Sequence, residues 1–240
     1  MEESLRGYVG SPLADSSAPC VTPVPQAALD AVDYYRKSRS EMLALLPPEP
    51  KRLIDIGCGE GFFGEAVKAR FPGCETWGVE PVVAAAKMAA TRNDRILNAP
   101  LDGVSELPDG YFDVVTMNDV LEHIAWPEPA LAAAKRVLKP DGRLVISLPN
   151  VQYLPNVLDL VQHNDWEYQD YGVLDRTHFR FYTSKSATRM LERNGFKVEQ
   201  VTGLNPMRPK WYFRVVFAMA PKYFYWMPFL QFAVVAKPLK

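Results

Sequence analysis

One group of residues in this 240-residue chain has the types and spacing that ligand chemistry requires. It is an acid followed by closely spaced glycines, Asp55 and then Gly57, Gly59 and Gly61, at the end of the apolar run 53–56. Such a run predicts a strand buried on both faces, and the amphipathic segment after the glycines predicts a helix. A glycine turn lets a ligand approach the backbone, and a helix N-terminus offers N–H groups. The stretch therefore predicts the opening unit of a doubly wound nucleotide-binding domain.

A second acid, Glu80, follows the predicted strand 75–79, roughly 20 residues past the glycines, as ribose recognition in such a fold needs. A carboxylate at this strand tip can accept hydrogen bonds from both hydroxyls of a ribose. Val82 comes two residues later, and we expect it to pack on an adenine ring. These positions predict a cofactor that contains a nucleoside.

The register of the glycines separates two cofactor classes. Residues 59–64 fit the dinucleotide pattern G-x-G-x-x-G, but in that pattern the first glycine follows the strand directly, and here that residue is Gly57. Residues 55–61 closely resemble motif I of class I S-adenosylmethionine-dependent methyltransferases. Residues 107–123, which include Leu121-Glu122-His123, and residues 136–144 also resemble patterns of that family. Within the first of these we expect a buried strand over 112–117 and a helix that begins at Asn118.

The resemblance implies a Rossmann-like α/β fold, a doubly wound seven-stranded sheet of order 3-2-1-4-5-7-6 with its last strand antiparallel. It implies S-adenosyl-L-methionine as cofactor and S-adenosyl-L-homocysteine as product. The cofactor-binding residues that it implies are Asp55, Gly57, Cys58, Gly59, Gly61, Phe62, Glu80, Pro81, Val82, Asn118 and Asp119. The family's usual acid after the third strand would fall near Pro100, so Leu101 and Asp102 are the expected substitutes.

Residues 149–183 form an insertion after the fifth strand, where this fold places its substrate lid. Residues 174–183 resemble the Leu-Asp-x-Thr-His-x-Arg-Phe-x-Thr signature of methyltransferases associated with sugar and polysaccharide biosynthesis. Methylation of a hydroxyl requires removal of its proton, which a histidine of near-neutral pKa can perform. His178 and His123 are therefore the candidate catalytic residues. The expected substrate-binding residues are Tyr171, Asp175, Arg176 and Arg180.

A structural role competes with each of these assignments. Both histidines could instead bond backbone or carboxylate groups and hold the lid closed, and Arg180 could pair with an acid of the lid. Glu122 is expected to support the loops rather than touch substrate.

A second insertion, residues 204–228, carries ten large aromatic or methionine side chains within 211–227, together with Lys210, Arg214 and Lys222. Aromatic residues with long cationic neighbours favour peripheral contact with a membrane surface or a lipid-carrier substrate. The competing interpretation is packing against the lid or against a second copy of the chain. Pro221 and Pro228 argue against one continuous helix.

Length and composition limit the remaining possibilities. The chain predicts a flexible arm over 1–25 and a single methyltransferase domain over 26–240, which begins with a helix over 26–46. A net charge of −1 with interspersed signs gives no footprint for nucleic acid. The three cysteines show no metal or disulfide spacing, so we expect no metal and a reducing, cytoplasmic location. No signal peptide or transmembrane run is visible.

Three functions follow from these features. The first is O-methylation of a sugar, glycan or similar hydroxylated small molecule. The second is methylation of a lipid or quinone-like acceptor at a membrane surface, which the aromatic insertion favours. The third is a cofactor-binding accessory subunit without turnover, since the motif residues bind rather than react. The sequence leaves the acceptor, the methylated atom and the oligomeric state open.

Overall fold

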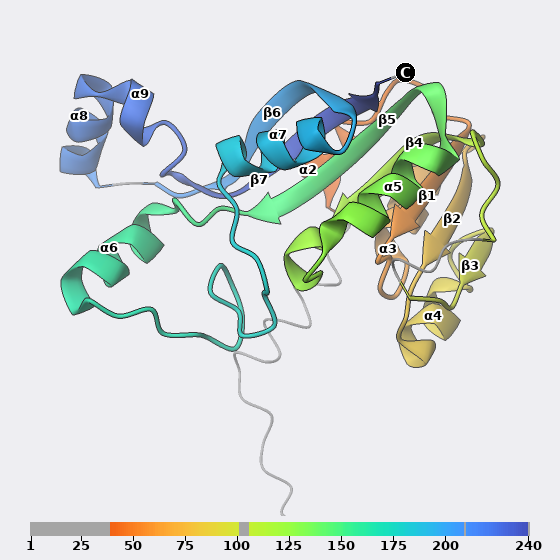
Figure 1. Cartoon of the computed structure of the whole chain (residues 1–240), viewed down its shortest axis with the longest axis horizontal. Coiled ribbons are helices and arrows are strands. Elements are labelled where there is room, and N and C mark those ends of the chain that lie inside the picture. Colours follow the sequence, from red (N-terminus) through yellow and green to blue (C-terminus); the bar gives the residue numbers. More distant parts are fainter. Residues whose placement is uncertain (1–38, 101–105, 209, 240) are drawn as a thin grey trace, which may run out of the picture.

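The computed structural model describes residues 39–100, 106–208 and 210–239. Their strands form one seven-stranded sheet in the order β3-β2-β1-β4-β5-β7-β6 (Figure 1). β1, β2, β3, β4 and β5 pair in parallel, whereas β7 runs antiparallel to both β5 and β6. The predicted fold and strand order are confirmed. The predicted arm 1–25 and the first part of the predicted helix 26–46 lie outside the described residues.

The elements have the following bounds. The strands are β1 Arg52–Ile56, β2 Glu75–Val79, β3 Arg95–Leu97, β4 Phe112–Asn118, β5 Leu138–Pro149, β6 Phe196–Pro206 and β7 Phe229–Pro238. The α-helices are α2 Ser40–Leu43, α3 Phe62–Arg70, α4 Val83–Ala89, α5 Pro127–Val137, α6 Leu154–His163, α7 Ser184–Arg193, α8 Trp211–Met219 and α9 Pro221–Phe224. One 3₁₀ helix, η1, spans Leu121–His123.

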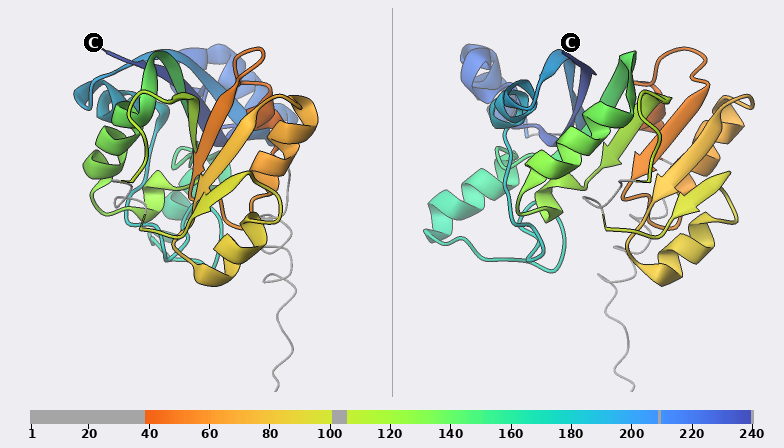
Figure 2. Two further views of the ribbon diagram at one scale, coloured as in Figure 1. Left: turned by 90° about the vertical axis from the view of Figure 1, so that its right-hand side faces the viewer. Right: turned by 45° about the vertical axis from the view of Figure 1, so that its right-hand side comes forward.

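Side chains of the central strands alternate between two apolar cores. Ile54 and Ile56 of β1 join the larger core, which receives Leu131 from α5 and Leu191 from α7. Leu53 joins the smaller core, which includes Phe63 and Val67 of α3. This alternation follows from the two-residue period of a strand, and it explains why Leu53, Ile54 and Ile56 are all apolar although they point to different faces. Figure 2 shows helices on both faces of the sheet.

The segment after β4 differs from expectation. We expected a helix from Asn118, but Asn118 ends β4 and Asp119 has a left-handed backbone (φ 52°). Such a conformation interrupts helical geometry, so only the short 3₁₀ turn η1 forms. The prediction of a helix beginning at Asn118 is wrong, and its consequence is that Glu122 and His123 lie on a tight turn.

Both insertions leave the sheet at the carboxyl end of the parallel strands. The lid follows β5, and α8 and α9 connect β6 to β7 (Figure 1). The fully buried Asn150 joins them, because its Nδ2 donates to the carbonyls of Trp226 (2.7 Å) and Phe229 (2.8 Å). α8 and α9 are separate helices, as the prolines predicted.

Candidate active site

The glycine turn lies between β1 and α3, at the carboxyl edge of the sheet. Gly57 has φ 76°, and a Cβ there would lie 2.6 Å from Cγ2 of Val120, so this position requires glycine. Gly59 has φ 53°, and a Cβ there would meet nothing within 4 Å. The turn is therefore packed beneath Gly57 and open above Gly59, which is where a ligand can approach.

The N–H groups of the turn are used largely within the fold. Those of Gly57 and Cys58 donate to the carbonyl of Val79, at 2.8 and 3.1 Å. That of Gly59 donates to Glu80 Oε2 (2.9 Å), and that of Gly61 to the carbonyl of Cys58 (2.9 Å). These four N–H groups already have partners within the protein. The turn therefore lets a ligand come close to the backbone but does not offer it these donors.

Asp55 ends β1 almost completely buried. Its Oδ1 accepts hydrogen bonds from Thr116 Oγ1 (2.6 Å) and Asn118 Nδ2 (3.2 Å). Burial raises the pKa of Asp55 to about 7, against the effect of these two hydrogen bonds. Oδ1 of Asn118 is buried and has no hydrogen-bond partner in the described part of the chain. The Asp55 carboxylate and the Asn118 amide oxygen are therefore neighbouring acceptors, and among the described residues the amide oxygen has no donor.

Glu80 connects the turn to the tip of β2. Its Oε2 accepts from the N–H of Gly59, and its Oε1 accepts from the N–H of Val82 (2.9 Å). A carboxylate has about four acceptor positions, so two remain for a ligand. Pro81 and Val82 are exposed beside it, with 58% of Val82 accessible, which leaves an apolar surface for a flat ring.

Asp119 is engaged within the protein. Its Oδ1 accepts from Ser147 Oγ, and its Oδ2 accepts from Gln231 Nε2 (both 2.7 Å) and pairs with Arg39 (2.8 Å). These contacts tie β4, β5, β7 and the start of α2 together. The structure thus shows Asp119 as a link between elements at the edge of the site.

Of four further residues that we expect at the cofactor, the structure describes two, which lie in different surroundings. The Cys58 thiol is buried against Gly78, and burial raises its pKa, so this residue offers a ligand its backbone only. The ring of Phe62 is covered by the guanidinium of Arg92, with Cζ 4.1 Å from the ring centroid. Leu101 and Asp102 lie outside the described residues.

The two candidate histidines, His123 and His178, lie side by side although they are distant in the sequence. Thr177, which precedes His178, is 54 residues from His123. Their ring centroids are 4.7 Å apart. His178 is buried, and its Nδ1 lies 3.0 Å from the carbonyl of Val173. His123 Nδ1 lies 3.3 Å from the carbonyl of Thr177 and 3.1 Å from its hydroxyl. Because a carbonyl only accepts, each Nδ1 carries the proton and each Nε2 keeps its lone pair.

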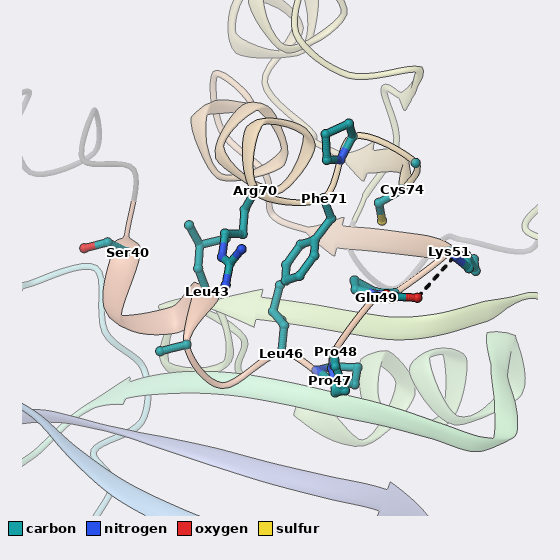
Figure 3. A pocket seen from close by; sticks show the side chains of 14 residues that line it. Ser40, Leu43, Leu46, Pro47, Pro48, Glu49, Lys51, Arg70, Phe71 and Cys74 are labelled. Carbon is teal, nitrogen blue, oxygen red and sulfur yellow. Dashed lines mark ion pairs between the residues drawn. The ribbon is translucent and has the colours of Figure 1, made fainter.

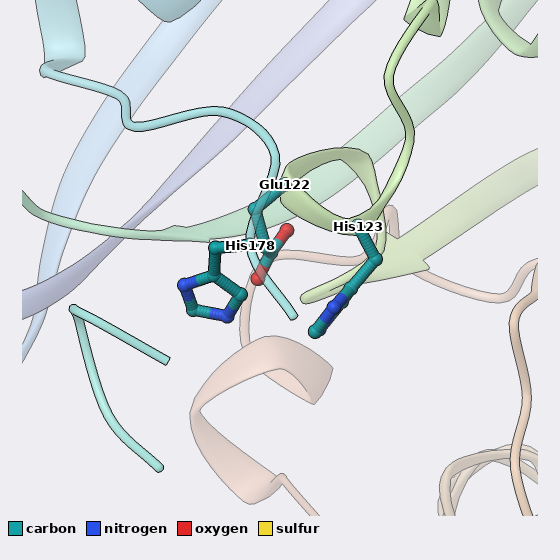
Figure 4. A group of neighbouring side chains, drawn as sticks. All are labelled: Glu122, His123 and His178. Carbon is teal, nitrogen blue, oxygen red and sulfur yellow. The ribbon is translucent and has the colours of Figure 1, made fainter. Parts of the chain in front are cut away.

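Glu122 completes this cluster, which the sequence did not indicate. Ligand atoms of Glu122, His123 and His178 all lie within 4.8 Å of one another, and Figure 4 shows the carboxylate beside the two rings. The carboxylate is buried, and neither oxygen has a hydrogen-bond partner among the described residues. Burial and the nearby Asp119 raise its pKa well above the ordinary value. The only sequence signal was its place beside His123.

Glu122 also supports the lid, as expected. Its backbone carbonyl accepts from the N–H groups of Phe179 (2.8 Å) and Arg180 (3.2 Å). The residue therefore has two functions, since the backbone holds the lid while the side chain stays available.

The four expected substrate-binding residues do not converge. Tyr171 is exposed, and Arg176 forms a surface ion pair with Asp170. Arg180 donates to the carbonyl of Ala125 (2.8 Å), which is a structural bond rather than the expected ion pair. Asp175 is buried and accepts from the Thr177 hydroxyl at 2.6 Å, so it acts on His123 through Thr177. Among the four, only Asp175 is connected to the histidine cluster through its side chain.

A separate hollow lies at the opposite edge of the sheet, beside the start of β1 (Figure 3). It is lined mainly by Leu43, Leu46, the prolines at 47, 48 and 50, and Phe71. Because this edge lies at the amino ends of β1 and β2, the hollow is remote from Asp55 and Glu80. It does not belong to the candidate active site.

Comparison with known proteins bears on the class of this site. A family model described as a methyltransferase domain matches residues 30–201, most of the chain. The chain belongs to this methyltransferase family.

Its relatives and structural neighbours agree with that membership. Ubiquinone biosynthesis O-methyltransferase of Rhodopseudomonas palustris (strain BisB18) is 30% identical over 168 residues, which cover 67% of this chain and 64% of the relative. The mitochondrial enzyme of the same name from Schizosaccharomyces pombe is 27% identical over 171 residues, covering 67% and 61%. The chain thus spans less than two thirds of the length of either relative. A SAM-dependent methyltransferase structure from Archaeoglobus fulgidus shares the fold, with a TM-score of 0.60, 21% identity, and coverage of 88% of this chain and 92% of that one.

The resemblance implies S-adenosylmethionine as cofactor, and the residues present fit it. Oδ1 of Asn118, beside Asp55, has no hydrogen-bond partner among the described residues, and a donor on the cofactor such as its ammonium group would satisfy it. Glu80 retains acceptor positions for ribose hydroxyls, and Val82 presents an apolar surface for adenine. The open face of Gly59 leaves room between them.

Proposed function

We propose that this methyltransferase methylates a hydroxyl of a lipid-soluble, quinone-like phenol at a membrane surface. The observation that carries this proposal is the α8–α9 hairpin, residues 210–228. It exposes large apolar side chains, among them Trp211 (75% accessible), Met219 (81%), Tyr223 and Tyr225. Its charged residues are all basic, namely Lys210, Arg214 and Lys222. Exposed apolar side chains with cations suit the boundary of an anionic bilayer.

The hairpin is placed to deliver an acceptor to the site. It leaves the sheet at the same edge as the glycine turn, and Asn150 ties it to the lid. α6 of the lid also exposes apolar side chains, Leu160 and Val161. A lipid tail held by these helices would leave its polar head beside the lid. None of the described helices is long and apolar enough to cross a bilayer, so the contact that we propose is peripheral.

The relatives support the same acceptor class. Enzymes named for O-methylation in ubiquinone biosynthesis are about 30% identical to this chain. We therefore place the quinone-like acceptor ahead of the sugar or glycan that the lid signature favoured.

The cluster of Glu122, His123 and His178 supports the removal of a hydroxyl proton. When bound, the cofactor supplies a methyl group on a positively charged sulfur. The chain must hold the acceptor oxygen and take its proton. The Nε2 lone pairs of both histidines are available for this, and burial together with the neighbouring His178 lowers the pKa of His123, which keeps that ring neutral near pH 7.

Methyl transfer from labelled cofactor tests the proposal. The acceptors are a prenylated dihydroxybenzoate in phosphatidylglycerol vesicles and, in parallel, a panel of free sugars and nucleotide sugars. We expect labelled product from the phenol only. Methylation of a sugar without that of the phenol would overturn the proposed acceptor. Absence of turnover on every acceptor, with normal cofactor binding, would favour the accessory subunit.

A further inference from the structure

We propose that Glu122, His123 and His178 bind a divalent transition-metal cation, which holds the acceptor hydroxyl. The sequence predicts no metal, because no run of residues shows metal-ligand spacing. The fold instead assembles the ligands from η1 and the lid (Figure 4).

The Glu122 carboxylate is the first reason for this assignment. It is 1% accessible, and both of its oxygens lack a hydrogen-bond partner among the described residues. Leaving a buried carboxylate unpaired is costly, so native structures pair such groups or place them on a metal. The two neighbouring histidine rings direct their Nδ1–H groups to carbonyls, so they offer the carboxylate lone pairs rather than N–H donors. A cation satisfies all three groups at once.

The orientation of the two histidines is the second, independent reason. Ligating histidines usually donate their other ring N–H to a carbonyl or carboxylate, which fixes the tautomer. Both histidines do this, His178 toward Val173 and His123 toward Thr177. The Thr177 hydroxyl in turn donates to Asp175 at 2.6 Å. A second shell of partners therefore already orients both Nε2 atoms.

The ligand set indicates the kind of cation. Two imidazoles and one carboxylate suit zinc, manganese or ferrous iron better than magnesium or calcium, which prefer oxygen ligands. The ligand atoms lie up to 4.8 Å apart. Metal–ligand distances of about 2.0–2.2 Å then require the cluster to tighten by roughly an ångström on binding. Three protein ligands leave positions open for substrate oxygen, as in catalytic sites.

The role of the cation rests on the proposed function. A hydroxyl oxygen bound to it becomes more acidic, and its proton passes to water. The histidines would then act as ligands, and neither would serve as the free base.

Metal binding is tested without acceptor or cofactor, so its outcome does not depend on the proposed acceptor. The full chain is stripped with a chelator and titrated with Mn²⁺, followed by electron paramagnetic resonance, and Zn²⁺ competes in a second titration. We expect one Mn²⁺ per chain, displaced by Zn²⁺. Glu122→Gln and His178→Ala should each weaken binding at least tenfold. His163→Ala is the matched control, because His163 is exposed on α6 and contacts Asp159.

Folding of each variant is checked by circular dichroism, and the half-buried His123→Asn provides a milder replacement if His178→Ala does not fold. Absence of stoichiometric binding, or binding that survives the Glu122 and His123 substitutions, would overturn the proposal. Undiminished methylation of the phenol in excess chelator would overturn the catalytic role alone. Metal binding without methylation of the phenol would overturn the proposed acceptor alone.

Discussion

Asp55 is the residue at which we expect stability and cofactor binding to oppose each other. It accepts two side-chain hydrogen bonds, yet burial keeps its pKa near 7, far above that of an exposed aspartate. A carboxyl group whose pKa is higher in the folded than in the unfolded chain binds protons more tightly when folded. The free energy of unfolding therefore falls as pH rises from about 4 to about 7.

We predict that Asp55→Asn stabilises the chain above pH 7 and impairs cofactor binding. The asparagine carries no buried charge, and Asn118 can turn its unpartnered Oδ1 toward the new amide. At about 1.4 kcal/mol per pKa unit, the gain at pH 8 is at most about 4 kcal/mol and vanishes below pH 4. Urea unfolding between pH 4 and pH 8 measures it.

Asp113→Asn provides a control in which the stability at high pH should change in the opposite direction. Partial burial acts against ionisation there, but the Lys139 ammonium and the N–H groups of Arg52 and Lys51 hold its pKa below the ordinary value. Asp113→Asn should therefore lose stability at pH 8. Equal pH profiles for the Asp55 variant and the unmodified chain would contradict the assignment.

Glu80 yields a prediction about affinity. In Glu80→Gln, the amide NH₂ cannot accept from the backbone, so either Gly59 or Val82 loses its partner, and a ribose loses acceptors. A charged hydrogen bond contributes about 1.5–3 kcal/mol, which corresponds to a roughly 10- to 150-fold weaker Kd for S-adenosylhomocysteine. Calorimetry measures this, with Glu199→Gln on β6 as control because Glu199 pairs with Arg143 and Lys237. An unchanged Kd would refute the ribose role of Glu80.

At the scale of elements, the two insertions are joined at Asn150. Its amide donates to the carbonyls of Trp226 and Phe229, and its Oδ1 accepts from the N–H of Gln152 at 3.1 Å. The lid and the hairpin thus share a buried anchor at the end of β5. Their movements are expected to be coupled.

We predict that Asn150→Ala destabilises the fold by about 2–4 kcal/mol, because it removes two hydrogen bonds to the carbonyls of Trp226 and Phe229 and leaves a cavity in place of a fully buried side chain. Hydrogen exchange should rise over residues 224–230 in particular. Asn156→Ala, which removes one partly buried bond to the carbonyl of Val151, is the control and should cost less. Faster exchange spread over the whole sheet, without a focus at 224–230, would argue against a local anchor.

At the scale of the whole molecule, the candidate active site and both insertions lie at one edge of the sheet. The parallel strands bring the glycine turn, Glu80 and Asn118 to their carboxyl ends, and both insertions leave from the same edge. The hollow beside the start of β1 lies at the other edge and contains none of these groups.

We predict that the chain binds anionic vesicles through α8 and α9. Trp211→Ala combined with Met219→Glu should reduce cosedimentation with phosphatidylglycerol vesicles about tenfold or more, since it removes exposed apolar area and adds a repelled charge. Trp126→Ala is the control, because Trp126 is similarly exposed but lies outside the hairpin. Vesicle binding that persists in the double variant, or that is equally strong with uncharged lipid, would show that the hairpin does not contact the membrane.

The sequence by itself determined the features that depend on contiguous residues. The strand, glycine turn and helix around Asp55, the acid at the tip of β2 and the aromatic hairpin interrupted by proline are all local patterns. The strand order followed from the resemblance to the family, and the structure confirms it. Local patterns persist because hydrophobic period, turn geometry and helix termination act over a few residues.

Tertiary structure alone decided which side chains meet and which remain free. Asp119, which we expect at the cofactor, also contacts Arg39, Ser147 and Gln231, and Arg180, which we expect at the substrate, also donates to the carbonyl of Ala125. Glu122, expected only to support loops, has a buried carboxylate beside two histidines and without a hydrogen-bond partner among the described residues. Burial and convergence depend on the path of the lid over η1, and contacts between segments more than fifty residues apart leave no periodic signal in the sequence.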